Sequence, residues 1–308
     1  MNIYEALVAK YGDYKSSYIR IPTGSINLNE AVGGGYPMGR IIEIFGGEGS
    51  GKTTLGLMAL AEGQGLNMPV ALIDPEYSLD INYAHAIGLR GKPNKDFGHL
   101  LPEYGEEAIN MIIDAITNNI KVIVVDSVAA MIPKAELIGE VGEAHMGLQA
   151  RMMGQAMRKL TGMVSRNKML LIFINQVRSK IGVFFGSSEV TTGGRALKFY
   201  ASIRIGIRAA DADESGHVIK IKIFKNKTAV PFKVADLPLR YGLGVDIYEE
   251  FFEKMKEFGK IETHGSWYHC DDQKFLGKDS VIGYLRDMYP RNALIPLYRK
   301  ELKKVERN

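Results

Sequence analysis

Short apolar runs alternate with longer amphipathic segments through the first two-thirds of the chain. Four of these runs contain almost no polar residue, and we predict that they form strands at 41–45, 70–73, 122–125 and 169–174. Such continuous apolarity is typical of strands buried on both faces of a parallel sheet. The segments between them predict helices at 52–65, 79–88, 105–118 and 148–166. The alternation therefore indicates an α/β fold in which helices cover a mostly parallel sheet.

The pattern changes twice in the last third of the chain. After residue 195 the strand-like runs become longer, as at 200–208 and 218–225, which indicates that antiparallel strands extend the sheet. A second change follows Tyr241-Gly242-Leu243-Gly244, beyond which lie a Lys/Glu-rich amphipathic segment and a basic end. We expect a short N-terminal oligomerisation segment, a main core and a small α+β C-terminal domain, at 1–20, 21–246 and 247–308.

Composition narrows the class of protein. With 46% hydrophobic and 24% charged residues among 308, the chain has the make-up of a globular protein with a large core. A net charge of +4 permits a polyanionic partner without requiring one. Cys270 is the only cysteine, which excludes an internal disulfide and a Cys-based zinc site. We found neither a secretion signal nor an apolar run approaching the ~20 residues of a membrane span, so we expect a cytoplasmic protein.

The segment 46–54 reads Gly-Gly-Glu-Gly-Ser-Gly-Lys-Thr-Thr between a predicted strand and a predicted helix. Its spacing fits the P-loop pattern, in which backbone N–H groups and a helix N-terminus bind phosphate. Lys52 then neutralises phosphate charge and the Thr53 hydroxyl is a suitable ligand for Mg²⁺. A glycine-rich turn with an incidental lysine is the alternative. The predicted nucleotide contacts are Gly46, Gly47, Glu48, Gly49, Ser50, Gly51, Lys52, Thr53 and Thr54.

Polar side chains follow three of the predicted strands, where ligands of open α/β sheets bind. Asp126 follows 122–125 and fits the Mg²⁺-binding acid of such sites, the alternative being a helix N-cap. Glu76, just beyond the strand 70–73, can reach the water that faces a γ-phosphate and act as a general base. A solvated loop carboxylate is the competing interpretation. Gln176 offers a neutral amide that can sense a γ-phosphate.

A basic, glycine-rich segment at 177–198 suggests binding of single-stranded nucleic acid. Its cations suit phosphates, and the pair Phe184-Phe185 offers flat side chains for bases. A surface loop with incidental charge is the alternative. The basic residues and glycines are Arg178, Lys180, Arg195, Lys198, Gly182, Gly186, Gly193 and Gly194.

Several stretches resemble, in order and spacing, the RecA family of bacterial strand-exchange recombinases. They are Gly35-Tyr36-Pro37-Met38-Gly39-Arg40, the P-loop, Val124-Val125-Asp126-Ser127-Val128-Ala129-Ala130, His145-Met146-Gly147, Arg151-Met152-Met153, Phe173-Ile174-Asn175-Gln176-Val177-Arg178 and Thr191-Thr192-Gly193-Gly194. The resemblance covers 21–246 strongly and the remainder weakly. It implies a RecA-type P-loop NTPase core and an ATP-dependent helical filament on single-stranded DNA. Such a filament pairs its strand with a homologous duplex in recombination, repair and the SOS response to DNA damage.

The same resemblance assigns roles to individual residues. Glu76 is similar to the catalytic glutamate, Asp126 to the Walker B acid and Gln176 to the γ-phosphate sensor. Tyr83 would stack on adenine, and Asp80 would bind its amino group. Two further lysines, Lys225 and Lys227, would reach the ATP of the neighbouring subunit, so that ATP holds the filament together.

The resemblance also implies DNA contacts. Met146 and Ile181 would wedge between base triplets. The residues that resemble phosphate contacts of the family are Arg151, Arg158, Arg178, Gly193 and Gly194. Lys180 and Arg195, in the basic segment, are further candidates for DNA contacts. Contacts of this kind carry little base information, so base pairing between strands would read homology.

Three departures from the family pattern concern regulation. Arg195 stands where the family usually has asparagine, only about forty residues precede Gly39-Arg40, and the Lys-rich end lacks an acidic tail. We expect these three departures to alter how the filament is regulated. The chain would act in a bacterium, or in a host cell infected by a phage that encodes it. A ring helicase or branch-migration motor of the same fold and a regulatory ATP-binding module are the alternative functions. The two loops and the lysine pair favour the filament, and an intact Glu76 argues against the module.

Overall fold

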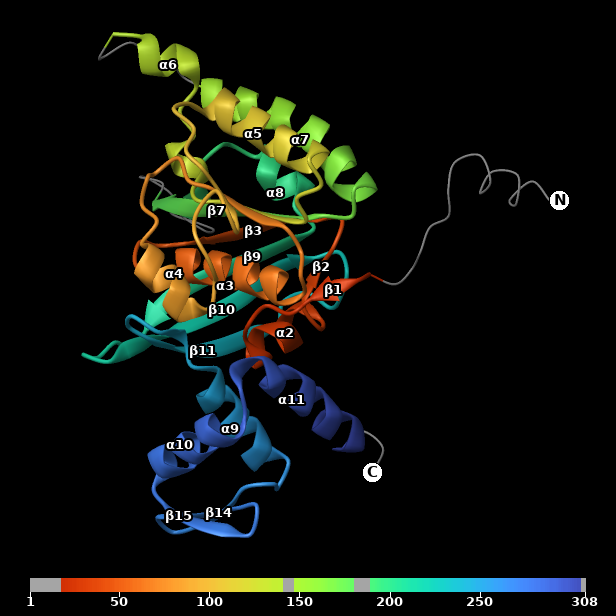
Figure 1. Ribbon diagram of the computed structural model, residues 1–308. Helices are drawn as coiled ribbons and strands as arrows, with labels where there is room; N and C mark the ends of the chain where they lie inside the picture. The colour runs from red at the N-terminus through yellow and green to blue at the C-terminus, as the bar shows by residue number, and fades with distance from the viewer. Residues whose placement is uncertain (1–17, 141–146, 180–188, 306–308) are drawn as a thin grey trace, which may run out of the picture.

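The computed structural model describes residues 18–140, 147–179 and 189–305. A ten-stranded sheet runs through the larger part of the molecule (Figure 1). Its strands, in spatial order, are β12 (Gly244–Val245), β11 (Val234–Arg240), β10 (Gly216–Asn226), β9 (Ile203–Ala210), β3 (Arg40–Gly46), β7 (Leu170–Ser179), β6 (Val122–Val125), β4 (Val70–Ile73) and β5 (Gly98–Leu100), with β8 (Glu189–Thr191) paired to β7.

Strands β9, β3, β7, β6, β4 and β5 pair in parallel, whereas β10, β11 and β12 extend the sheet in antiparallel fashion. The expected α/β class is therefore confirmed, and the four predicted parallel strands lie within one residue of their predicted starts. One detail differs: of the strands after residue 195, β9 still pairs in parallel with β3, and β10 is the first that pairs in antiparallel fashion with its neighbour. Strand β5 was not predicted, since its three half-buried residues contain no apolar run.

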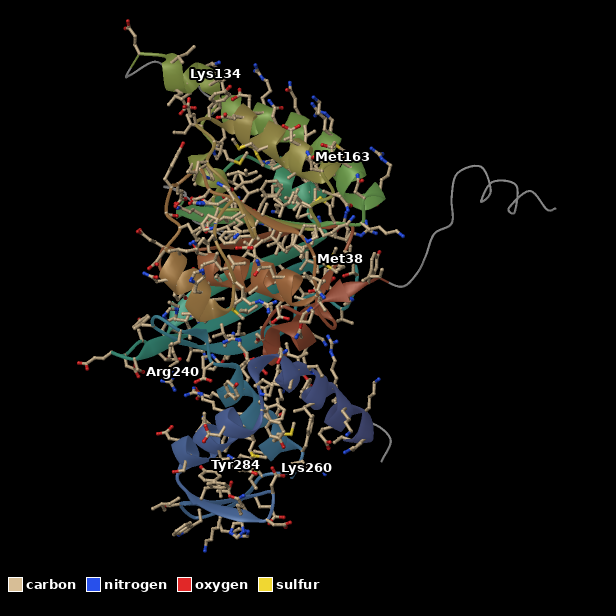
Figure 2. All side chains as sticks on the ribbon, in the orientation of Figure 1. Met38, Lys134, Met163, Arg240, Lys260 and Tyr284 are labelled. Atoms are coloured by element: carbon tan, nitrogen blue, oxygen red, sulfur yellow. The ribbon has the colours of Figure 1, made fainter. Side chains whose placement is uncertain are left out.

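Helices cover both faces of the sheet, and side chains fill the space between the layers (Figure 2). On one face, α2 (Ile26–Val32), α3 (Lys52–Gly65) and α4 (Ile81–Ile87) contribute to the larger apolar cluster. On the other, α5 (Gly105–Thr117), α7 (Leu148–Arg166) and α8 (Ala196–Tyr200) pack over a second cluster, and the short α6 (Lys134–Ile138) lies beyond them (Figure 1). The four predicted helices agree with α3, α4, α5 and α7.

The C-terminal part has an apolar cluster of its own. It consists of α9 (Ile247–Glu257), β13 (Glu262–His264), β14 (Trp267–Cys270), β15 (Gln273–Leu276), α10 (Lys278–Met288) and α11 (Arg291–Val305). Ile26 of α2 joins this cluster, and Arg240, labelled in Figure 2 near the junction, donates to Glu249 at 3.1 Å. A small pair, β1 (Arg20–Ile21) with β2 (Tyr36–Pro37), flanks the main sheet. None of the described helices is long and apolar enough to cross a membrane.

Candidate functional site

The glycine-rich loop connects β3 to α3, and its glycines serve two purposes. A Cβ atom on Gly46 would lie 2.2 Å from the carbonyl oxygen of Ile207, so the loop packs directly against β9. Gly51 caps α3 with a φ of 91°, in the left-handed region that favours glycine. By contrast, Cβ atoms on Gly47 and Gly49 would meet nothing within 4 Å. The loop is thus fixed at its ends and open along its middle, which suits a ligand that approaches the backbone.

Lys52, the first residue of α3, brings a buried positive charge to this loop. Its Nζ donates to the carbonyl of Gly47 at 2.5 Å, and only 8% of the residue is exposed. Desolvation lowers the pKa of Lys52, and the carboxylates of Asp126, Glu76 and Glu48 partly offset that effect. A desolvated ammonium is stabilised by an anion, so the helix N-terminus and Lys52 together favour phosphate at this position.

Thr53 and Asp126 meet although they lie far apart in the chain. The Thr53 hydroxyl donates to Asp126 Oδ2 at 2.6 Å, which brings the start of α3 to the end of β6. The pKa of Asp126 is raised to about 6, with burial as the largest cause. The Thr53 hydrogen bond and Lys52 act to lower this pKa, and the charges of Glu76 and Asp74 act to raise it. A cation would relieve this cost, and both oxygens are of the hard kind that Mg²⁺ prefers.

Glu76 follows β4 and reaches the same end of the sheet. Its carboxylate accepts a short hydrogen bond from the hydroxyl of Ser127, the neighbour of Asp126. The preceding carboxylate of Asp74 is buried and accepts from the N–H groups of Ser78 and Leu79, so it holds the turn that carries Glu76. Glu76 is exposed, as the loop interpretation expects, yet its side chain is held beside the Thr53–Asp126 pair.

Gln176 is placed beside the loop by the strand register. It lies opposite Gly46 in the parallel β3–β7 pair, and its carbonyl accepts from Thr192 N at 3.3 Å. The preceding Asn175 is fully buried and bonds both the Thr192 hydroxyl, at 2.5 Å, and Glu43, at 3.0 Å. Thus Gln176 connects the glycine-rich loop to the return end of the basic segment.

Glu43 continues this network into the middle of the sheet. It is fully buried and pairs with Arg204 of β9, with Nε 2.5 Å from its Oε2. The guanidinium also lies 4.5 Å from the centre of the Phe45 ring. Sequence reasoning did not single out this pair, although a charge inside an apolar strand is a signal that a partner is needed.

Lys225 of β10 is the register partner of Arg204 of β9. The hydrogen bonds of the Lys225 side chain are directed away from the glycine-rich loop. Its Nζ donates to the carbonyls of Lys198 and Phe199 in α8, at 3.0 and 2.8 Å. Desolvation, with repulsion from Lys227 and Arg204, lowers the pKa of Lys225 to about 8. Lys227 is exposed. The structure therefore groups the two lysines with each other and not with the loop of their own chain.

A hollow of about 260 Å³ continues from residues 49–54 toward a set of ring side chains. Tyr83 lines it, as expected, and its hydroxyl shares a 2.7 Å hydrogen bond with Thr54. Asp80 caps α4 through Oδ1, which accepts from the N–H groups of Asn82 and Tyr83. His217 and Tyr241 also line the hollow and were not predicted, because only the pairing of β10 with β11 brings them there.

The predicted DNA contacts are only partly described. Met146, Lys180 and Ile181 lie outside the described residues, as does the side chain of Arg178. Arg151 and Arg158 are exposed on α7, seven residues apart and hence on one side of the helix. Arg195 is exposed at the start of α8.

The glycine pair before Arg195 has a packing reason. Gly193 and Gly194 have φ values of 76° and 77°, and Cβ atoms there would lie 2.9 Å from Val128 and 2.6 Å from Ala150. The end of the basic segment is therefore packed against the N-terminal part of α7. This places the Arg195 region near the helix that carries the two exposed arginines.

The chain is similar to known proteins over most of its length. A family model described as the RecA N-terminal domain matches residues 4–246. The RecA protein of Mycoplasma mycoides is 46% identical over 296 residues, covering 92% of this chain and 84% of that protein. The RecA protein of Colwellia psychrerythraea is 43% identical over 327 residues, covering 97% of this chain and 93% of that protein. The RecA protein of Gluconacetobacter polyoxogenes is 47% identical over 279 residues, covering 87% of this chain and 78% of that protein.

Proposed function

Because the chain belongs to the RecA family, we propose that the loop at 46–54 binds ATP with Mg²⁺ and that α7 and the basic segment bind single-stranded DNA. As a member of this family the chain is a DNA-dependent ATPase and a recombinase of homologous recombination and repair, which works as a helical filament. The proposal concerns which residues carry this activity, and in what role.

The observation that carries the proposal is the meeting of Thr53, Asp126 and Glu76 at the end of the parallel strands. Thr53 and Asp126 would hold Mg²⁺, which neutralises phosphate charge when bound. No group of three or more His, Cys, Asp or Glu side chains in the described part of the chain could hold a metal ion. Phosphate oxygens and water would therefore complete the coordination, as is usual for Mg²⁺ at nucleotide sites.

Glu76 is the proposed general base for hydrolysis. Its carboxylate would accept a proton from the water that attacks the γ-phosphorus, while the bond to the β–γ bridging oxygen breaks to leave ADP and phosphate. The hydrogen bond from the Ser127 hydroxyl would orient this carboxylate. Lys52 would hold the phosphates, and Gln176, beside Gly46, would respond to the γ-phosphate and pull on the basic segment through Thr192.

Lys225 and Lys227 are proposed to act on the ATP of the neighbouring subunit. Their grouping next to α8, away from the P-loop of their own chain, supports such a role. Phosphate from a second subunit would stabilise the protonated form of Lys225, whose pKa is lowered to about 8 here. ATP would then favour assembly, because a ligand that binds only the assembled state shifts the equilibrium toward it.

Single-stranded DNA and a homologous duplex are the proposed partners, together with further copies of the chain. Exposed Arg151, Arg158 and Arg195 support phosphate contacts, and no particular sequence would be preferred. In the structure, the Asp80 side chain caps α4. A hydrogen bond from the adenine amino group to Asp80, and stacking of Tyr83 on the adenine, are part of the proposal. The cytoplasm of a bacterium, or of a phage-infected host, is the proposed location.

The test compares ATP hydrolysis and strand exchange with and without circular single-stranded DNA. We expect hydrolysis to rise steeply with DNA and joint molecules to form with ATP or a slowly hydrolysed analogue. Glu76→Gln should still bind ATP and assemble, but hydrolyse about a hundredfold more slowly or worse. Hydrolysis indifferent to DNA would contradict the filament mechanism. Unwinding of a duplex without homologous pairing would instead support a motor.

A further inference from the structure

Strand β5 carries a histidine whose side chain contacts the turn on which Glu76 lies. The His99 Nε2 atom is 3.2 Å from Oδ2 of Asp74, and the His99 side chain is 17% exposed. The Asp74 side chain is 1% exposed, and its Oδ1 atom has no hydrogen-bond partner among the described residues. The backbone N–H of His99 donates to Asn94 Oδ1 at 2.8 Å, which fixes the histidine in its strand. A buried carboxylate thus joins β5 to the turn.

The other partners of Asp74 Oδ2 determine where the imidazole proton lies. This oxygen accepts hydrogen bonds from the backbone N–H groups of Ser78 and Leu79, at 2.9 and 3.1 Å. An oxygen that accepts from two N–H groups acts as a carboxylate acceptor, so His99 must contribute the proton from Nε2. His99 is therefore a third donor to the oxygen that closes the turn, beside two backbone groups of the turn itself.

Further contacts hold the same turn against β5 and the residues that follow it. Asp74 N donates to the carbonyl of Leu100 at 2.9 Å. The Tyr77 hydroxyl donates to the carbonyl of Pro102 at 3.1 Å. Tyr77 has a φ of 56°, a left-handed conformation that bulky residues adopt only where the surrounding contacts maintain it. The conformation of the turn that carries Glu76 thus depends on contacts from β5 and its neighbours, outside the phosphate loop.

We propose that His99 is a positioning residue for ATP hydrolysis: by donating to Asp74, it holds the turn from which Glu76 faces the attacking water. This inference rests on the proposed role of Glu76 as the general base and adds a residue that acts on the same step. Catalysis is sensitive to such support, because a displacement of about 1 Å can slow a reaction about a hundredfold. The competing account is that His99 stabilises β5 and affects only the amount of folded protein.

The contacts indicate which kinetic constant depends on His99. Phosphate binding is assigned to the loop at 46–54 and Lys52, and none of the described hydrogen bonds of His99 or Asp74 reaches that loop. Loss of the His99 donor should therefore lower kcat and leave KM for ATP nearly unchanged. A histidine that only stabilises the fold would change neither constant per folded molecule.

Three substitutions in the full-length protein test this, with steady-state ATP hydrolysis measured at saturating Mg²⁺ and circular single-stranded DNA. His99→Leu removes the donor, His99→Gln places an amide N–H at a reach similar to that of Nε2, and His99→Asn places it one bond short. We expect kcat to fall about tenfold or more for Leu and Asn and to stay within about threefold of the parent for Gln. KM should stay within about twofold for all three.

Circular dichroism at the assay temperature gives the folded fraction, so that kcat is expressed per folded molecule. If the Leu variant does not fold, the Gln and Asn variants still differ only in the reach of the same amide. A Gln variant as slow as Asn, an Asn variant as fast as the parent, or a loss confined to KM would overturn the proposal.

A second measurement asks whether His99 acts through Glu76. In the Glu76→Gln background, adding His99→Leu or His99→Asn should change single-turnover hydrolysis by less than about twofold, because no carboxylate remains to be positioned. Losses that multiply would show that His99 acts independently of Glu76 and would also overturn the proposal. Unimpaired hydrolysis by Glu76→Gln alone would contradict the proposed general base. A slow Glu76→Gln protein beside His99 variants with the kcat of the parent would contradict this inference alone.

Discussion

The carboxylate of Asp126, a proposed Mg²⁺ ligand, lowers the stability of the folded protein at neutral pH. Its pKa is raised to about 6, above the usual value of 3.8, chiefly by burial. A carboxylate with a raised pKa favours folding while it is protonated, and that contribution is lost as pH rises through about 6. At neutral pH the charged form therefore opposes folding by about 2–3 kcal/mol, from the linkage of pKa to stability.

Asp126→Asn should consequently stabilise the nucleotide-free protein at pH 7.5 by about 1–3 kcal/mol. The asparagine can still accept the Thr53 hydrogen bond, but it lacks the charge that would hold Mg²⁺. Urea unfolding at several pH values would measure the difference, which should shrink toward pH 4. ATP hydrolysis by this variant should be lost. A variant less stable than the parent at pH 7.5 would contradict the assigned cost of burial.

At the level of elements, strand pairing in the sheet depends on a buried ion pair as well as on apolar contacts. Glu43 and Arg204 lie opposite each other in β3 and β9, and both are almost fully buried. Removing one partner leaves an uncompensated charge, whereas replacing both by apolar residues is often tolerated. We expect Arg204→Met to cost about 3–5 kcal/mol in the free energy of unfolding.

The double variant Glu43→Met with Arg204→Met serves as the matched control. It should recover most of that loss in urea unfolding, because neither charge remains to be paired. Asn175 would lose one of its partners but keep its bonds to Thr192. A double variant as unstable as the single one would show that the pair stabilises the sheet through more than mutual compensation.

The elements that could be predicted are those whose signal is local. Strands β4 and β6 are uninterrupted apolar runs, and α7 shows helical spacing along its whole length. Strand β5 could not be found this way, since its burial depends on β4 beside it. The same limit applies to the candidate site, because the P-loop is contiguous in sequence whereas His217 and Tyr241 reach the hollow beside it only through the pairing of β10 with β11.

At the scale of the whole molecule, the two lysines lie apart from the ATP site of their own chain. Lys225 bonds α8 and Lys227 is exposed, so their removal should leave ATP binding by the isolated chain within about twofold of the parent, as for most surface substitutions. DNA-dependent hydrolysis should fall by about a hundredfold or more, as for loss of charge stabilisation at a shared site. Titration and steady-state kinetics of Lys225→Ala/Lys227→Ala would check this. Equal losses in both measurements would place the lysines in their own subunit's site.

The core and the C-terminal part are joined through a buried carboxylate. Glu250 of α9 accepts from the Ser25 hydroxyl and from Ile26 N, each at 2.7 Å, at the start of α2. Burial raises its pKa to about 7, above the usual 4.5, although these hydrogen bonds and Arg291 act in the opposite direction. Its protonated form therefore favours the folded, joined molecule below about pH 4.5, and this contribution disappears as pH rises through about 7.

Glu250→Gln should remove this pH dependence, because its carbonyl oxygen can still accept from Ile26 N while its amide nitrogen can donate to the Ser25 hydroxyl oxygen. We expect the variant to exceed the parent in unfolding free energy at pH 8.5 by about 1–3 kcal/mol, and to approach it at pH 5. Glu250→Ala should instead destabilise at every pH, because Ser25 and Ile26 lose a buried acceptor. Because Glu250 lies at the junction, the resistance of the segment 240–247 to limited proteolysis should rank the Gln variant, the parent and the Ala variant in the same order as their unfolding free energies. A Gln variant with the pH profile of the parent would mean that other groups set the stability of the junction.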